Sequence, residues 1–188
     1  MLNKIAFTSA LATVAVMSGA ASAQNFSLSI PDLKAGKFTN EQFLSETYGF
    51  GCSGDNASPR LTWSGAPAGT RSFVLTVYDK DAPTGFGWVH WVVANIPGNA
   101  IEIARGITSD GVGLPAGSLQ TRTDFGVPGY GGPCPPQGST HNYVITLTAL
   151  KVDKLPDAVT QNAPPALVGF FTKANSLGEA TLVVNQGR

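Results

Sequence analysis

The sequence predicts one mainly β domain with antiparallel strands, and three observations lead to this prediction. Several short apolar runs are well separated along the chain, helical spacing appears only late, and strands and helices do not alternate. The 22 glycines and 13 prolines suit short strands joined by many turns. Because 43% of the 188 residues are hydrophobic, the chain has enough apolar material for one core.

The first half of the chain contains four expected strands. Phe26–Ile30 alternates apolar and polar residues, which is typical of a half-buried strand. Leu61–Trp63 and Ser72–Tyr78 are apolar runs separated by a glycine- and proline-rich connection of hairpin length. Trp88–Ile96 is apolar almost throughout, which predicts a central strand covered on both faces.

The second half begins with residues 97–117, which are rich in glycine and proline and predict a surface excursion. Asn142–Val152 then has the alternation of another strong strand. Two prolines precede residues 166–177, where apolar residues recur at helical spacing, so a helix is expected there. Glu179–Asn185 is expected to close the chain as a strand.

Residues 1–23 have the pattern of a secretory signal peptide. Lys4 supplies a positive charge, Ile5–Met17 a short apolar segment, and Ala21–Ala23 a small-residue cleavage site. Thirteen residues fall short of the roughly 20 that span a bilayer, so we expect no membrane span. The mature domain is then residues 24–188, and we expect it to be periplasmic or secreted.

The charged residues exclude nucleic acid as a class of partner. Twelve lysines and arginines balance twelve aspartates and glutamates, so the formal net charge is 0. The sequence contains no basic run or stripe that could neutralise a phosphate backbone.

The two cysteines, Cys52 and Cys134, lie in glycine-rich segments rather than in apolar strands. An even pair in an exported protein favours a disulfide, because the compartment is oxidising. The alternative is two free thiols, one of which could serve as a nucleophile. That alternative is weaker, because a disulfide would consume the nucleophile.

Polar residues cluster where the expected central strands meet a turn. Asp79 and Asp81 are spaced i, i+2 at a strand end, so they can share a face. The turn after them could bring His90 level with the carboxylates, and the only other histidine, His141, lies in a second turn-rich segment. The alternative is structural: aspartates beside proline and glycine are common turn formers, and His90 could be a hydrogen-bonded core residue.

Both turn-rich segments resemble the phosphatidylethanolamine-binding protein family, specifically its bacterial Raf-kinase-inhibitor-like branch. Two departures stand out: Lys80 where the family usually has proline, and Asn142 where it has arginine or histidine. The motifs that carry the resemblance are Asp79–Pro83 (DKDAP), His90–Trp91 (HW), Asn95–Gly98 (NIPG), Gly132–Gly138 (GPCPPQG) and His141–Tyr143 (HNY). Asn56–Trp63 (NASPRLTW) and Gln120–Gly126 (QTRTDFG) fit the same branch.

The resemblance implies a large central antiparallel sheet packed on a smaller sheet, with a few peripheral helices. It also implies cis peptides near the site, for which Ala82–Pro83 is the candidate because a cis bond before proline costs little. The implied ligand-binding residues are Asp79, Asp81, His90, Pro136, His141 and Tyr143, with Gly132 and Cys134 shaping the rim and Trp88 and Arg122 at the mouth.

These residue types suit a small phospho-anion or a phospholipid headgroup. Imidazoles and a phenol hydroxyl can donate hydrogen bonds to phosphate oxygens. An aspartate that accepts a ring N–H orients a histidine and favours its charged form. We therefore expect an exported, non-enzymatic binding module without a cofactor. The resemblance adds inhibition or regulation of a protein partner, such as an exported protease or a host protein.

The main alternative is a periplasmic metal-dependent hydrolase. Two aspartates and two histidines could hold a divalent ion in the same pocket. Their spacing is not that of a recognised zinc motif such as H-E-x-x-H, so the signal for this alternative is weak.

Overall fold

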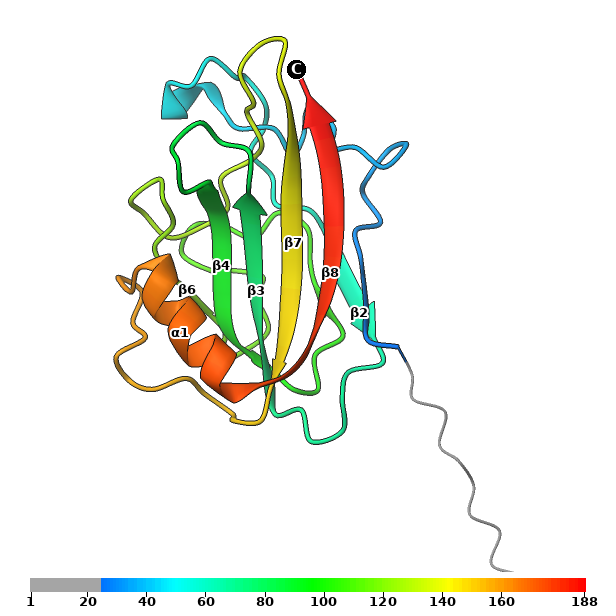
Figure 1. Ribbon diagram of the computed structural model, residues 1–188, viewed down its shortest axis with the longest axis vertical. Helices are drawn as coiled ribbons and strands as arrows, with labels where there is room; N and C mark the ends of the chain where they lie inside the picture. The colour runs from blue at the N-terminus through cyan, green and yellow to red at the C-terminus, as the bar shows by residue number, and fades with distance from the viewer. Residues whose placement is uncertain (1–24) are drawn as a thin grey trace, which may run out of the picture.

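The computed structural model describes residues 25–188, so the predicted signal peptide, residues 1–23, lies outside the described residues. A five-stranded antiparallel sheet forms the centre of the molecule, with the strand order β6-β4-β3-β7-β8 (Figure 1). Its strands are β3 (Ser72–Asp79), β4 (Trp88–Pro97), β6 (Leu119–Gln120), β7 (Thr140–Leu150) and β8 (Ser176–Gly187).

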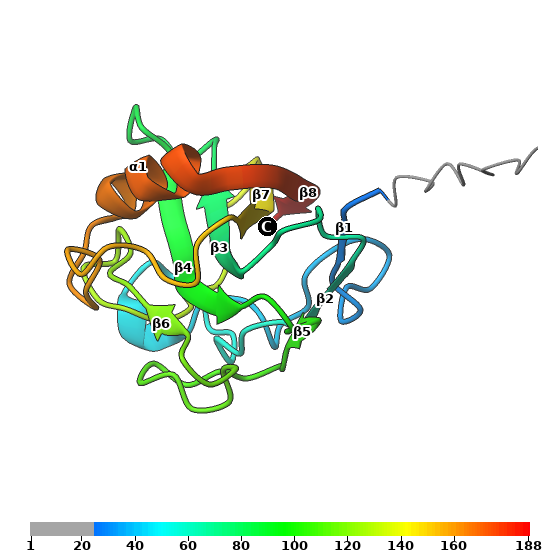
Figure 2. The same ribbon diagram turned by 90° about the horizontal axis from the view of Figure 1, so that it is seen from below.

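A smaller three-stranded sheet lies on one side of the large sheet, and one helix covers the other side (Figure 2). Across residues 25–188 the structure has one α-helix and one short 3₁₀ helix (Glu46–Tyr48), where a few peripheral helices were expected. The predicted mainly β class with a large and a small sheet is confirmed. The remaining elements are β1 (Ser27–Ser29), β2 (Leu61–Ser64), β5 (Glu102–Ile103) and α1 (Pro165–Asn175).

The alternation of apolar side chains explains the two layers of core. On β3, Phe73, Leu75 and Val77 pack between the two sheets, whereas Val74 packs toward α1. β4 lies between β3 and β6 and buries apolar side chains on both faces, as the continuous apolar run predicted. Asp79 follows Val77 on the face between the sheets, so the core pattern itself aims the carboxylate inward.

Two expectations about local structure are wrong, and that of a surface excursion at residues 97–117 holds only in part. β2 and β3 do not form a hairpin but belong to different sheets, and Trp63 packs on Phe73 across the core with ring centroids 5.5 Å apart. The segment 97–117 contributes β5 to the small sheet. Residues 25–188 contain no cis peptide bond, so Ala82–Pro83 is trans.

The helix is present, but its buried face differs from the predicted stripe. α1 buries Val168 and Thr172, whereas Phe170, which the helical spacing placed on the apolar side, is 68% exposed. Among residues 25–188, no helix has the length and apolar character that crossing a bilayer requires.

Candidate functional site

A cavity of about 190 Å³ opens at the end of the large sheet where β3 turns into β4 and where β7 begins. This end of the three strands is at the top of Figure 1. Segments far apart in the sequence meet there. The lining residues are Leu44, Phe50, Asp79, Ala82, Pro83, Thr84, Trp88, His90, Phe125, Cys134, Pro136, His141 and Tyr143.

Two paired strands form one side of the cavity, which we call the ladder wall (Asp79, His141 and Tyr143). Asp79 on β3 is the register partner of Tyr143 on β7, and His141 lies two residues earlier on the same face. The Nδ1 atom of His141 donates a hydrogen bond to Oδ2 of Asp79 at 2.6 Å. Asp79 and His141 are only 3% and 6% exposed, so this pair is almost completely withdrawn from solvent.

Tyr143 completes the ladder wall with a hydroxyl that has no hydrogen-bond partner in the described part of the chain. Burial raises the pKa of Tyr143, and the nearby charge of Asp79 raises it further, so the phenol stays protonated. A buried hydroxyl without a partner is costly. The Asp79 carboxylate and the N–H of Cys134 lie near this hydroxyl, but neither makes a hydrogen bond of acceptable geometry, so Tyr143 has an unused donor at the cavity.

A β-bulge places His90 at the cavity. Val77 pairs with Trp91 and Tyr78 pairs with Val89, so His90 is the extra residue that has no register partner on β3. Trp91 is buried in the core between the sheets, and strict alternation would point the preceding residue away from it. Because the bulge interrupts the alternation, both His90 and Trp91 turn toward the same side.

The loop after Tyr130 holds the ring of His90. The Nδ1 atom of His90 donates a hydrogen bond to the carbonyl oxygen of Gly131 at 2.8 Å, and the backbone N–H of Gly131 donates to the carbonyl of His90 at 2.9 Å. Burial lowers the pKa of His90, because the charged ring would lose its hydration. The ring is therefore neutral at neutral pH and has its unprotonated nitrogen at Nε2.

A second part of the lining, which we call the loop wall (Phe50, Phe125, Cys134 and Pro136), is made by loops. The predicted Cys52–Cys134 disulfide is confirmed, with 6.0 Å between the Cα atoms, and it joins the loop that contains Phe50 to the loop that follows Gly132. Phe50, Trp88 and Phe125 pack edge to face around the opening, with centroids 5.4 to 6.1 Å apart.

Gly132 is necessary for the loop wall because two backbones meet there. A Cβ atom at this position would lie 2.0 Å from the carbonyl oxygen of Gln42 and 2.6 Å from the backbone nitrogen of Leu44. Asn56 fixes the same loop, since its Nδ2 donates to the Tyr130 carbonyl and its Oδ1 accepts from the N–H of Gly132. Gly132 thus stands behind the cavity and is not part of its lining.

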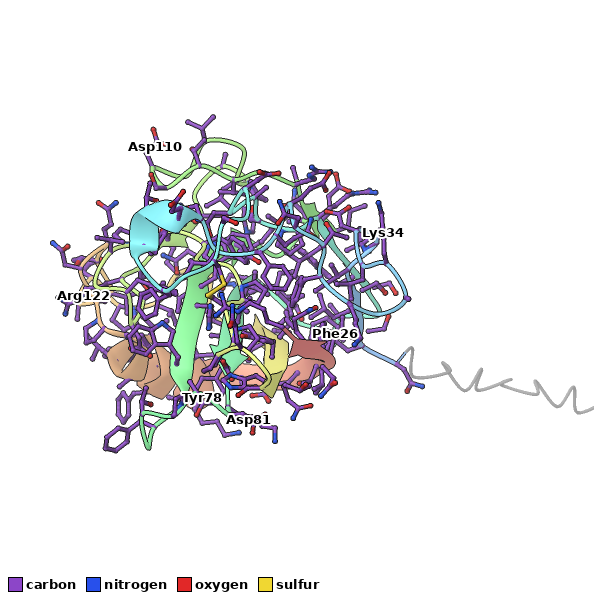
Figure 3. All side chains as sticks on the ribbon, turned by 90° about the horizontal axis from the view of Figure 1, so that it is seen from above. Phe26, Lys34, Tyr78, Asp81, Asp110 and Arg122 are labelled. Atoms are coloured by element: carbon purple, nitrogen blue, oxygen red, sulfur yellow. A yellow bond between two sulfur atoms is a disulfide. The ribbon has the colours of Figure 1, made fainter. Side chains whose placement is uncertain are left out.

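The structure brings together seven of the ten residues that the resemblance implied. Two of the other three, Asp81 and Arg122, are exposed and lie outside the lining, at different edges of the molecule (Figure 3); the third is Gly132. β3 ends at Asp79, so the i, i+2 alternation does not extend to Asp81. The seven lining residues are Asp79, Trp88, His90, Cys134, Pro136, His141 and Tyr143.

Asp81 instead pairs with Asn142, whose backbone N–H and side-chain amide donate to Oδ2 at 2.7 and 2.8 Å. These hydrogen bonds, the backbone one first, lower the pKa of Asp81. No three His, Cys, Asp or Glu side chains of residues 25–188 gather in a group that could hold a metal ion. The four-residue set behind the hydrolase alternative is therefore not assembled, because Asp81 is apart from the other three.

Sequence reasoning missed the apolar part of the lining. Phe50 and Phe125 lie in glycine-rich segments whose patterns give no strand or helix face, so nothing local indicates where their rings point. Asn56 opens one of the motifs that fit the resemblance, but nothing in the sequence indicated that its side chain would hold the loop. In the structure it has φ +53°, a region in which asparagine is enriched among residues other than glycine.

Comparison with known proteins gives a consistent result. A family model described as phosphatidylethanolamine-binding protein matches residues 34–187. The protein YbcL of Escherichia coli is 44% identical over 175 residues, which are 90% of this chain and 91% of YbcL. YbhB of Escherichia coli is 49% identical over 134 residues, 71% of this chain and 84% of YbhB.

A solved structure and a more distant relative extend the comparison. The crystal structure of YbcL, described as a new member of the mammalian PEBP family, matches with a TM-score of 0.81 at 43% identity and covers 87% of this chain and 98% of that one. LppC of Mycobacterium tuberculosis, named as a proposed lipoprotein, is 45% identical over 114 residues, 59% of this chain and 52% of LppC.

Proposed function

This chain belongs to the phosphatidylethanolamine-binding protein family, and from that premise we propose that it is a non-enzymatic module that binds a small phospho-anion or a phospholipid headgroup. One observation carries the proposal. Nε2 of His90, Nε2 of His141 and the hydroxyl of Tyr143 form no hydrogen bond within residues 25–188, and all three residues line one cavity. Unused polar groups in a buried site favour a polar ligand that satisfies them.

The chemistry of these groups suits a phosphate group. The Tyr143 hydroxyl is a donor, and Nε2 of His141 donates when the ring is protonated, with Asp79 bonded to the other nitrogen. The aromatic residues Phe50, Trp88 and Phe125 surround these donors with apolar surface. A phosphate group that carries an organic substituent would therefore bury its polar end and place the substituent against the rings.

We also propose that the domain works outside the cytoplasm. The signal-peptide pattern of residues 1–23, the Cys52–Cys134 disulfide and the similarity to a proposed lipoprotein support export. A regulatory role toward an exported protease or a host protein is a further hypothesis. Recovery of a stoichiometric complex from periplasmic extract, lost when the cavity is mutated, tests it.

Calorimetric titration of ligand-free protein tests the proposal. Inorganic phosphate and phosphoethanolamine should each bind saturably with one site between pH 5 and 8. Tyr143→Phe should weaken binding about tenfold, because it removes one hydrogen bond worth roughly 1.4 kcal/mol. Asp81→Asn is the matched control and should leave the affinity unchanged.

Absence of saturable binding to either ligand would refute the proposal. Metal analysis of the purified protein, together with phosphoesterase assays after metal addition, would test the hydrolase alternative. Activity that requires a metal and is lost in His141→Gln would favour that alternative over a binding module.

A further inference from the structure

We infer that His90 acts as a hydrogen-bond acceptor that selects anions carrying a proton of their own. The site would then take the singly charged form of a phosphate monoester or phosphonate in preference to the doubly charged form or to sulfate. This inference rests on the proposed function, because it concerns the ligand of the same cavity.

The hydrogen bond of His90 fixes the tautomer. Gly131 offers a carbonyl oxygen, which can only accept, so the proton of a neutral His90 ring is on Nδ1. Nε2 then has a lone pair and cannot donate to an anion. A phosphate oxygen without a proton would meet that lone pair unfavourably, whereas a P–OH group would donate to it.

The other charges near the cavity favour a ligand with a single negative charge. None of the lining residues is a lysine or an arginine, and the lining already contains the buried carboxylate of Asp79. Lys80 pairs with Asp81, and Arg188 contacts the disulfide sulfur of Cys52 at 2.8 Å. A second negative charge on the ligand would therefore have only His141 to balance it in the lining.

The groups that face His90 from each neighbouring element have different effects on its charge. Asp79 on β3 and Asp124 in the loop after β6 favour a charged ring, as does the carbonyl of Gly131. Tyr143 on β7 packs edge to face on the ring at 5.2 Å and is neutral. Burial opposes the two carboxylates and is the largest influence, so the pKa of His90 is lowered and the ring remains neutral.

The first measurement is ³¹P NMR of phosphoethanolamine bound to the wild-type protein between pH 5 and 8, because the chemical shift reports the ionisation of the phosphate group. Free phosphate monoesters lose their second proton near pH 6. If the site prefers the monoanion at least tenfold, the bound ligand should lose that proton at least about one pH unit higher. A bound midpoint at or below the free value would overturn the inference and leave the proposed function standing.

The second measurement compares ligands by calorimetry. Phosphate affinity should fall by at least about tenfold in total as pH rises through the second ionisation of phosphate, and methylphosphonate affinity should begin to fall only at its own higher ionisation. Sulfate should bind at least about tenfold more weakly than phosphate at pH 5.5. If both ligands weaken at one shared pH, the titrating group belongs to the protein, and the inference is wrong.

Two variants test whether His90 is the source of the preference for the monoanion. His90→Phe removes the acceptor and should move the bound-ligand midpoint back to the free value, whereas Asp124→Asn should leave it in place. Asp124 lies outside the lining, and asparagine can still accept from the N–H of Val89. A midpoint in His90→Phe that stays raised would overturn the inference. No binding of phosphate, phosphonate or sulfate to the wild type would overturn the proposed function, and the inference with it.

Discussion

The two walls of the cavity are built in different ways, although each positions one of the chain's two histidines. On the ladder wall, Asp79 and His141 come from neighbouring strands whose backbones pair directly. The ring of His90, on β4, packs against Tyr143 and is bonded to Gly131, in the loop that Asn56 and the disulfide hold in place. Main-chain hydrogen bonds between strands therefore fix the ladder wall, whereas a few side-chain hydrogen bonds and one disulfide fix the loop wall.

The largest effect on stability is expected from removing the disulfide, because it is a covalent link whereas the others are hydrogen bonds. Its removal in a Cys52→Ala/Cys134→Ala variant should lower the free energy of unfolding by up to about 4.5 kcal/mol, the chain-entropy value for a loop that spans 82 residues. Urea denaturation of the variant and of the wild type measures this. Hydrogen exchange should rise in residues 49–54 and 130–136 and stay low in β3 and β7. Equal loosening of both walls would contradict the comparison.

Asn56→Ala should have the next largest effect. The change removes the donor to the Tyr130 carbonyl and the acceptor for the N–H of Gly132, so unfolding should become easier by about 1 to 3 kcal/mol. Asn56→Gly is the matched control, because glycine removes the same hydrogen bonds but adopts φ +53° without strain. If the two variants are equally destabilised in thermal or urea melts, the hydrogen bonds rather than the backbone conformation account for the loss.

The ladder wall was largely predictable from the sequence, and the loop wall was not. Alternation along β3 and β7 placed Asp79 and Tyr143 on core faces, because a strand repeats every two residues and its buried residues show the phase. The end of a strand is harder to locate. Asp81 was expected beside Asp79, but β3 ends at Asp79, two residues before Asp81, so the alternation does not reach it.

His90 lines the cavity because of a β-bulge in β4. The sequence does not predict this bulge, because Trp88–Ile96 is apolar almost throughout and shows no alternation that a bulge would interrupt. The roles of Phe50 and Asn56 depend on loops whose course is set by distant contacts. The resemblance supplied the histidines and the cysteines as candidates. It did not indicate that the partner of His90 is a carbonyl oxygen rather than an aspartate, and that difference changes the expected charge of the ring.

His90 should also make the stability of the fold depend on pH, because its ring is buried and bonds to a carbonyl rather than to a carboxylate. The folded-state pKa of His90 is lowered, so the unfolded chain binds its proton first as pH falls. Stability from the neutral ring is fully present above about pH 6.5 and is lost below it. Between pH 6.5 and 5 this loss is at most about 2 kcal/mol, because one group changes the unfolding free energy by no more than about 1.4 kcal/mol per pH unit.

Urea denaturation at several pH values, with and without His90→Gln, measures this contribution. The variant should show a flatter stability profile below pH 6.5 than the wild type. NMR titration of the His90 ring in the folded protein is the direct check. A ring that becomes charged above pH 6.5 would contradict the assignment of a neutral His90.

The smallest effect is expected from Asp81→Asn, which tests where the ladder wall ends. Asp81 is exposed, its carboxylate accepts hydrogen bonds from Asn142, and asparagine can still accept one of them through its side-chain oxygen. Because the cavity lining includes Asp79 but not Asp81, phosphate affinity should stay within about twofold of the wild type.

Asp79→Asn is the matched change inside the cavity and should weaken binding much more, because it replaces the carboxylate that bonds to His141. Calorimetric titration of both variants with phosphate decides the matter. A tenfold loss in Asp81→Asn would show that the carboxylate reaches the ligand and that the ladder wall extends beyond the end of β3.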